Sequence, residues 1–528
     1  MRYIVPVVAV LTLASPAAAQ SVDATGASQL TEDLKRYLGQ TAFEKGIVAV
    51  ALDGDAYKIT FAINALSTIL PENAKATLNF DSYEIRVKPR SDGSWDVAGP
   101  LLPNGSAAFE TPQGPQSMAW TSTDGLFTGV YDPALGSFTT AEGSVSKITS
   151  LSTEPLTNSE AAFGAGKFTM SGKPGANGGV DFDTQQSFAD FSQTVTITDP
   201  SAPMKFTMAS PQVKAVSTGS GLRSKPLLDL GAFLVANSDD EAKIKANQAE
   251  LKDRLLAILP VWNRIDGSYG LTDLNVGTPF GQFTAKDAGV SVAMDGISTN
   301  GSLNYGMKFA GLTVPAGLLP EWSAKILPTE IDLNFGGANL DLDTMVRAAI
   351  EAFDLNNNPP IPDDVAAKIG MDFLAKEPKF VINQSIVKNA ETQFAFSGDA
   401  VMRGEKPDVN LTIDATGYDA MVAHVQTAAA SDPQAQQAYP ALLAGKGFAK
   451  TMPDGSLQWV VNIKPDGSIL VNGGMIKGPD AVEAPAPIDP NAPPGTLTSP
   501  PAAETPAPNP APAPVDPNAP PGTLTSPQ

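Results

Sequence analysis

The sequence predicts an α+β fold built mainly on an antiparallel, twisted β-sheet with interspersed helices. Apolar and polar residues alternate over residues 303–309 and again over 409–415. A period of two is typical of a strand with one buried face. Tight-turn signals separate such runs, while other segments carry apolar residues at helical spacing. Helices scattered among hairpins indicate an α+β body rich in antiparallel sheet.

Three turns share the tripeptide Asp-Gly-Ser and begin at Asp92, Asp454 and Asp466. An Asp-Gly pair tolerates the positive φ angles of hairpin turns, and strand-like residues flank each of the three. The last turn lies between residues 457–463 and 469–471, and therefore predicts a closing hairpin.

Helices are predicted where apolar residues recur every three or four positions next to a capping or breaking residue. The first prediction carries Leu30, Leu34 and Leu38 and stops at Gly39. The longest covers residues 239–259 and stops at Pro260. The remaining predicted helices follow a cap at Asp343, follow Pro362, and hold Tyr418, Met421, Val422 and Val425.

The chain is expected to comprise four parts. Residues 1–19 are typical of a secretory signal peptide, because a positive start precedes a short apolar run and a small-residue cleavage point. A β-rich region is expected over residues 20–236 and an α+β region over 237–480, with the long predicted helix near the divide. Residues 481–528 are rich in proline and repeat the segment DPNAPPGTLTSP, so they are expected to be disordered.

Composition narrows the possible partners and chemistry. The formal charge of −21 repels nucleic acid and anionic headgroups. The chain has no cysteine, which excludes disulfides, thiolate metal sites and a cysteine nucleophile. No uncharged apolar run after the signal peptide is long enough to span a bilayer. The expected location is the periplasm of a bacterial envelope, or outside the cell.

Serine and histidine motifs give little support for catalysis. His424 is the only histidine, and it is expected on the flank of a helix. With one histidine and no cysteine in the chain, a zinc site of the usual composition is excluded. Ser144 and Lys147 match the Ser-x-x-Lys pattern of penicillin-recognising enzymes. The other two motifs of those enzymes are matched poorly. Residues 91–93, the candidate for the second motif, precede the Ser-x-x-Lys segment, and residues 450–452, the candidate for the third, lack the required glycine.

Asp354 begins a segment with some likeness to a calcium loop. Such a loop needs glycine at its sixth position and glutamate at its twelfth, where this chain has Pro359 and Val365. A helix end running into a proline break is therefore favoured. The glycine-rich residues 172–179 are interpreted as a loop, because no helical pattern follows to bind phosphate.

Carboxylate pairs are the one catalytic option that the sequence leaves open. Asp181 lies near Asp183, and Asp239 lies next to Asp240. Two acids brought together by the fold could hydrolyse a glycan. Neighbouring acids are also usual in an acidic protein, so this is an alternative hypothesis only.

The region 303–473 has a characteristic series of turn and strand signals. They are Gly311-Leu312-Thr313-Val314-Pro315, Phe396-Ser397-Gly398, Gly417-Tyr418-Asp419 and Val471-Asn472-Gly473. In these signals the chain resembles domain-of-unknown-function family 2125 of alphaproteobacterial envelopes and, more distantly, the AsmA-like envelope proteins. The AsmA-like likeness implies long twisted sheets with an apolar groove that can shield acyl chains. The family supplies no catalytic residues.

The function expected from these observations is that of an exported, non-enzymatic envelope protein. It would bind an apolar or envelope ligand such as a lipid, or act as a scaffold, with the tail as a spacer or as a contact for an unknown partner. No catalytic, cofactor-binding or metal-binding residue is assigned, and no cofactor is expected. The alternatives are a carboxylate-dependent glycan hydrolase and a secreted surface interaction protein.

Overall fold

A computed structural model of the protein describes residues 22–70, 75–237, 240–403 and 406–480. Within these ranges the strands form one 25-stranded sheet in which every pairing between strands is antiparallel. Helices interrupt the strands at several points along the chain. The mainly antiparallel α+β fold predicted from the sequence is therefore confirmed.

The chain divides into two units, Met1–Pro479 and Asp480–Gln528, and the fold described below is that of the first. The predicted signal peptide, the predicted disordered tail and Asp239 lie outside the described residues. Strands on either side of the predicted divide at residue 236 pair directly with each other, so the sheet continues across that position.

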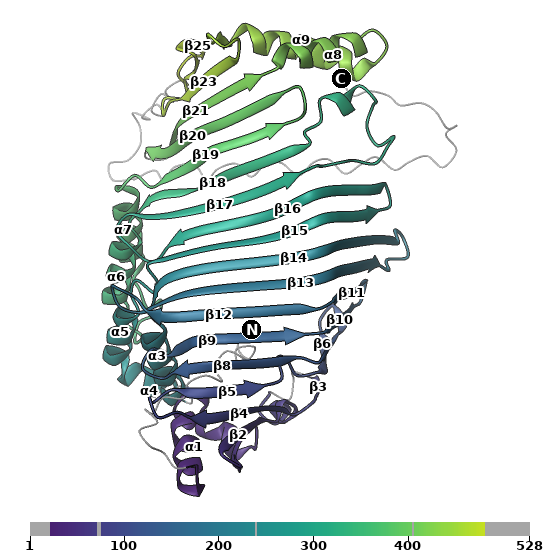
Figure 1. Ribbon diagram of the computed structural model, residues 1–528. Helices are drawn as coiled ribbons and strands as arrows, with labels where there is room; N and C mark the ends of the chain where they lie inside the picture. The colour runs from purple at the N-terminus through teal and green to yellow at the C-terminus, as the bar shows by residue number, and fades with distance from the viewer. Residues whose placement is uncertain (1–21, 71–74, 238–239, 404–405, 481–528) are drawn as a thin grey trace, which may run out of the picture. The chain divides into compact units, whose positions relative to one another are not determined.

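The middle of the sheet is a run of strands that follow one another in chain order, each paired with the next (Figure 1). Their bounds are β12 Gly166–Pro174, β13 Val180–Ile197, β14 Met204–Leu222, β15 Arg264–Thr278, β16 Gly281–Asp295, β17 Gly301–Ala310, β18 Glu330–Leu340, β19 Lys379–Lys388, β20 Gln393–Arg403 and β21 Lys406–Thr416.

At its N-terminal end the sheet splits into two arms at β13. The first half of β13 pairs with β12 and the second half with β11. One arm runs outward from β12 through β9 Ser137–Val145, β8 Leu126–Asp132, β5 Trp95–Gly99, β4 Tyr83–Pro89, β2 Ala56–Phe61 and β1 Val48–Asp53. The other runs through β11 Thr157–Phe163, β10 Lys147–Glu154, β7 Gly114–Thr123, β6 Gly105–Thr111 and β3 Ala76–Phe80.

At the opposite end, β21 pairs with β23 Leu457–Ile463. That strand also pairs with β22 Lys450–Thr451 and β24 Ile469–Val471, and β24 pairs with the last strand, β25 Gly474–Lys477. The predicted closing hairpin is thus present as β23 and β24.

The helices gather at the ends of the sheet and along one end of its strands. Figure 1 shows α3, α5, α6 and α7 lining the ends of the middle strands, on the left of the view. The bounds are α1 Ala24–Leu38, α2 Gln40–Glu44, α3 Ser224–Asn237, α4 Glu241–Ala246, α5 Gln248–Ala257, α6 Leu342–Ala352, α7 Asp363–Leu374, α8 Tyr418–Ala428 and α9 Pro433–Gly447, with 3₁₀ turns η2 Ile63–Thr68 and η4 Ser323–Lys325.

Two helix predictions need correction. The single helix expected over 239–259 is two helices, α4 and α5, separated at Asn247. The Asn247 side chain donates a 2.8 Å hydrogen bond to Asn237 at the end of α3, which holds the junction away from helical geometry. The cap of α6 is Asp341 instead of Asp343, since the carboxylate of Asp341 accepts from the backbone N–H of Thr344.

The Asp-Gly-Ser turns form as predicted. In each of them the aspartate carboxylate accepts a hydrogen bond from the backbone N–H of the serine two residues later. The central glycines have φ angles of 87°, 84° and 81°, which side chains rarely allow. These short turns join consecutive antiparallel segments with little connecting chain.

Each end of the sheet carries a buried apolar cluster. At the N-terminal end, Leu30 and Leu34 of α1 pack against Tyr57, Ile59 and Trp95 of the sheet, and further strand residues complete this cluster. At the other end, α8 packs against β21 and β23 through its own buried residues Tyr418, Met421 and Val422. The buried clusters anchor helices to the two ends of the sheet.

Replacing Leu34 with alanine should destabilise the protein by about 2–5 kcal/mol, because the side chain is 1% exposed and its removal leaves a cavity. Urea unfolding followed by far-UV circular dichroism measures the loss. The matched control is Leu126→Ala, since Leu126 is 63% exposed and should cost less than about 1 kcal/mol. Equal losses for the two variants would contradict the assignment of Leu34 to the core.

Asp55 should make stability depend on acid pH. Hydrogen bonds from Lys88 and then Arg86 on β4 lower the pKa of Asp55 from 3.8 to about 2. Because the folded pKa lies below the unfolded one, the stabilisation is present above about pH 4 and lost as pH falls through about 2. Asp55→Asn should therefore lower the urea midpoint at pH 7 but hardly at pH 2. In a Lys88→Met background, the effect of Asp55→Asn on the urea midpoint at pH 7 should be smaller. If Asp55→Asn lowers the midpoint equally at pH 7 and pH 2, this account is contradicted.

Candidate functional site

An unbroken row of non-polar residues crosses twelve strands of the sheet, from β9 to β23. Residues directly opposite each other in antiparallel strands project from the same face, so the register defines one apolar face. The row, called here the long apolar row, consists of Val145, Gly166, Phe188, Val213, Leu271, Ala288, Phe309, Ile331, Val387, Phe394, Ala415 and Leu457. At the usual spacing of neighbouring strands it is about 50 Å long.

Neighbouring rows extend the apolar face along the strands. Tyr269, Val290, Met307 and Leu333 are directly opposite one another on β15 to β18. An aromatic series lies beside them, with ring centroids 5.4 Å apart between Tyr305 and Phe335, and 6.5 Å apart between Phe335 and Phe380. The face is therefore apolar over a width of several residues.

In the middle of the sheet this face is partly open. Four of its large side chains, on β15, β16, β17 and β19, are exposed to a degree that core residues are not. They are Tyr269 at 41%, Val290 at 37%, Leu303 at 40% and Phe380 at 50%. Large apolar side chains that gather in one exposed patch mark binding sites more often than chance exposure does.

Helices cover the two ends of the same face. Ala415 and Leu457, the last two members of the long apolar row, belong to the cluster beneath α8. At the other end, α1 shares a buried cluster with residues of β1, β2, β4, β5, β8 and β9, and Phe168 and Met170 of β12 adjoin that cluster. The open stretch of the apolar face thus lies between two buried clusters.

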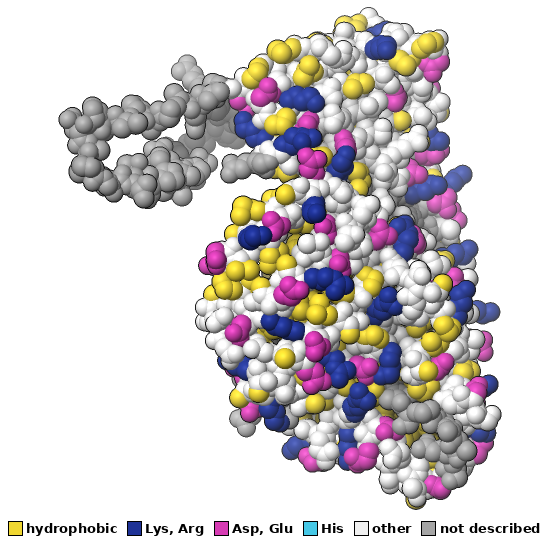
Figure 2. Space-filling model, turned by 90° about the vertical axis from the view of Figure 1, so that its left-hand side faces the viewer, with side chains coloured by type: hydrophobic (Ala, Val, Ile, Leu, Met, Phe, Trp, Pro, Cys, Tyr) yellow, Lys and Arg dark blue, Asp and Glu magenta, His cyan; other side chains and the backbone are white. Residues whose placement is uncertain are grey.

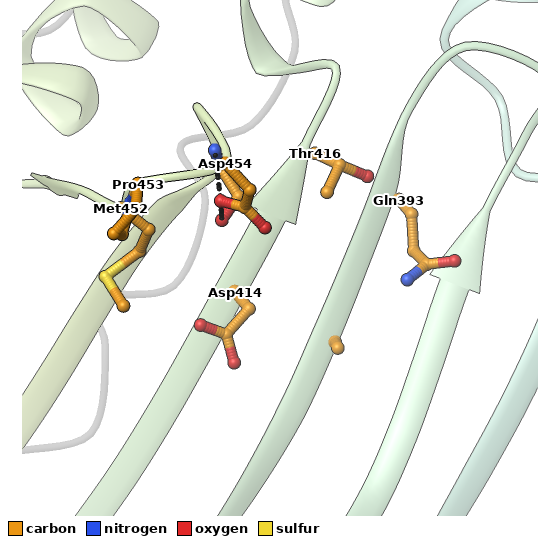
Figure 3. A pocket seen from close by; sticks show the side chains of 8 residues that line it. Gln393, Asp414, Thr416, Met452, Pro453 and Asp454 are labelled. Atoms are coloured by element: carbon orange, nitrogen blue, oxygen red, sulfur yellow. Dashed lines mark hydrogen bonds between the residues drawn. The ribbon is translucent and has the colours of Figure 1, made fainter.

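The cavity at β20, β21 and the turn before β23 tests the carboxylate hypothesis. It has a volume of about 480 Å³ and is lined by two acids, Asp414 and Asp454 (Figure 3). Ser456 donates to Asp454 through its hydroxyl and then its backbone N–H, which lowers the pKa of that carboxyl. Asp414 accepts a 2.9 Å hydrogen bond from Gln458. A glycan hydrolase needs a carboxyl with a raised pKa as its general acid, and Asp454 is shifted in the opposite direction.

Three of the other acids considered from the sequence, Asp181, Asp240 and Asp354, accept hydrogen bonds from backbone N–H groups. Asp181 accepts from the N–H of Gly221, and Asp240 caps α4 by accepting from Ala242. Asp183 lies on β13, two residues along from Asp181. Asp354 accepts from Asn356 and from Gln248, and these bonds hold a turn after α6.

The motif residues of serine and histidine chemistry are also dispersed. Ser144 is the last residue but one of β9 and Lys147 begins β10, so the Ser-x-x-Lys segment is a strand connection rather than the start of a helix. His424 lies on α8 outside its buried residues, and its Nε2 is 2.8 Å from Glu391. Within the described ranges, no group of three or more His, Asp or Glu side chains could hold a metal ion.

The side of the molecule lined by helices carries mixed charge. Figure 2 shows basic and acidic side chains interspersed over this side. Several form ion pairs one turn apart on the same helix, such as Arg254 with Glu250 and Arg347 with Asp343. Among the residues that the structure describes, no helix is both long and apolar enough to cross a membrane.

Comparison with known proteins gives no relative on which to base a function, because no family model, curated protein or solved structure matches this chain.

Proposed function

We propose that the protein is an exported, non-enzymatic envelope protein that binds the acyl chains of a lipid along its apolar face. The observation that carries the proposal is the apolar face, which runs between two buried clusters and exposes Tyr269, Val290, Leu303 and Phe380 beside the long apolar row. Ordinary core packing would leave Tyr269, Val290 and Phe380 largely buried. A flexible alkyl chain laid on this face would remove their apolar surface from water.

The dimensions of the face favour an acyl chain over a compact apolar ligand. The row is about 50 Å long, whereas the hydrocarbon core of a bilayer, which two opposed acyl chains fill, is about 30 Å thick. Each buried CH₂ group contributes about 0.8 kcal/mol, so even part of one chain supplies substantial binding energy. The aromatic series from Tyr305 to Phe380 adds flat surface across three strands.

Export and family membership are parts of the same proposal. The apolar run and cleavage point in residues 1–19 favour a secretory leader. The turn and strand signals of 303–473 favour kinship with family 2125 and, more distantly, with the AsmA-like proteins. The AsmA-like kinship implies long twisted sheets with an apolar groove that can shield acyl chains.

Val290→Asp should reduce lipid binding at least tenfold, because it places a charge in the middle of the apolar face. The measurement is fluorescence of the purified protein titrated with vesicles containing a trace of NBD-labelled phosphatidylethanolamine. Since Val290 is already 37% exposed, the variant should still fold. The control Thr207→Asp places the same charge on an exposed β14 residue that projects from the opposite face.

Protein purified without detergent should also release lipid in stoichiometric amount on solvent extraction and mass spectrometry. A lipid-free extract, together with no uptake of the NBD lipid, would rule out lipid binding and leave a scaffolding or surface interaction role. Equal binding by Val290→Asp and Thr207→Asp would place any lipid elsewhere.

Expression of the full chain in a Gram-negative host should yield a periplasmic product that begins at Gln20. The reason is that Ala17 to Ala19 supply the small residues a signal peptidase needs. Cell fractionation and intact-mass analysis test this, with a deletion of residues 1–19 as the control that should stay in the cytoplasm. A full-length product in the cytoplasm would contradict export, and product in the medium would favour secretion.

A further inference from the structure

The face of the sheet opposite the apolar face contains a hollow. The alternation of apolar and polar residues along the strands does not by itself produce one. Its volume is about 720 Å³, within the range of about 300–1,000 Å³ usual for ligand sites. It extends over β14 to β19, which lie side by side in Figure 1.

Small residues form the floor of this hollow. Ser268, Ser291 and Gly306 are directly opposite one another on β15, β16 and β17. Gly306 is buried, and a Cβ atom on it would lie 2.4 Å from the Ser291 hydroxyl and 3.0 Å from Oδ1 of Asn334. Any larger residue at position 306 would therefore fill the depression or push its walls apart.

Carboxamides form one wall. Asn304, Asn334, Asn383 and Gln384 come from three adjacent strands and all line the hollow. Asn383 donates a 2.7 Å hydrogen bond to Asn304, and Asn334 donates to Asp332 and to the Gln384 carbonyl. These bonds fix the orientation of the amides and still leave the Asn304 amide N–H groups and the Asn383 amide oxygen unpaired within the described protein.

The charge of the hollow is low. Asp266 is the only charged residue among those that line it. Arg264 pairs with Asp266 at 2.9 Å and with Asp295 at 3.1 Å, so the local balance is slightly negative. Elsewhere on the same face, Lys214 and Lys308 supply the charged side chains expected of a solvated sheet surface. An anionic ligand would thus be disfavoured, while an uncharged one would meet amides and hydroxyls.

We infer that this hollow binds a neutral oligosaccharide. Sugar hydroxyls each donate and accept a hydrogen bond, which matches amide and serine groups that do both. Fixed amides lose little conformational freedom on binding, which favours a recognition site over an ordinary polar surface. The site is on the face opposite the proposed lipid path, so either activity can be present without the other.

The test is isothermal titration calorimetry of the processed chain with chitotetraose, maltotetraose and tetragalacturonic acid. At least one of the two neutral tetrasaccharides should bind, and the anionic one should bind at least tenfold more weakly. Absence of measurable heat with both neutral sugars at millimolar concentration overturns the inference, as does equal binding of the anionic sugar.

Two variants locate the site. Ser291→Phe fills the floor, and Asn383→Ala removes one amide of the wall; each should weaken neutral-sugar binding at least tenfold. The control Ser192→Phe adds the same ring to an exposed serine of β13, outside the hollow. Unchanged affinity in Ser291→Phe and Asn383→Ala, with folding confirmed by circular dichroism, would overturn the site. Val290→Asp should keep sugar affinity unchanged, which separates this inference from the lipid proposal.

Discussion

The structure depends on one constraint: antiparallel register keeps the same face of every strand apolar across the sheet. In a single layer no second sheet can correct a slip, because a shift of one residue moves a whole strand's apolar set to the other face. The long apolar row shows that the register is maintained through twelve strands, including positions where a bulge lies nearby. Short turns such as Asp466-Gly467-Ser468 help to set it, because they leave little freedom in how two strands meet.

The two faces of the middle strands are chemically distinct although they share a backbone. One carries Tyr269, Val290 and Leu303 and stays partly open between buried ends. The other carries amides and hydroxyls around Gly306. A sandwich or a barrel hides one of its faces, whereas this sheet leaves both in contact with solvent. Binding on one face therefore need not exclude binding on the other.

Local patterns predicted much of this fold. The alternation at 303–309 and the turns at Asp92, Asp454 and Asp466 each involve a few neighbouring residues, so single segments could be interpreted correctly. Two features had no such signal. The split at β13 arises because its two halves pair with different strands, which no local pattern encodes. The exposure of Val290 also could not be predicted from the sequence, because a strand face covered by a helix shows the same alternation as one that is open to solvent.

From β14 to β20 each strand pairs only with the strands before and after it in sequence, so this part of the sheet is close to one-dimensional. One added hairpin would lengthen the sheet by about 10 Å without disturbing either anchored end. One lost hairpin would shorten it by the same step. The reach of the molecule is therefore adjustable in units of two strands, by duplication or deletion of short stretches of sequence.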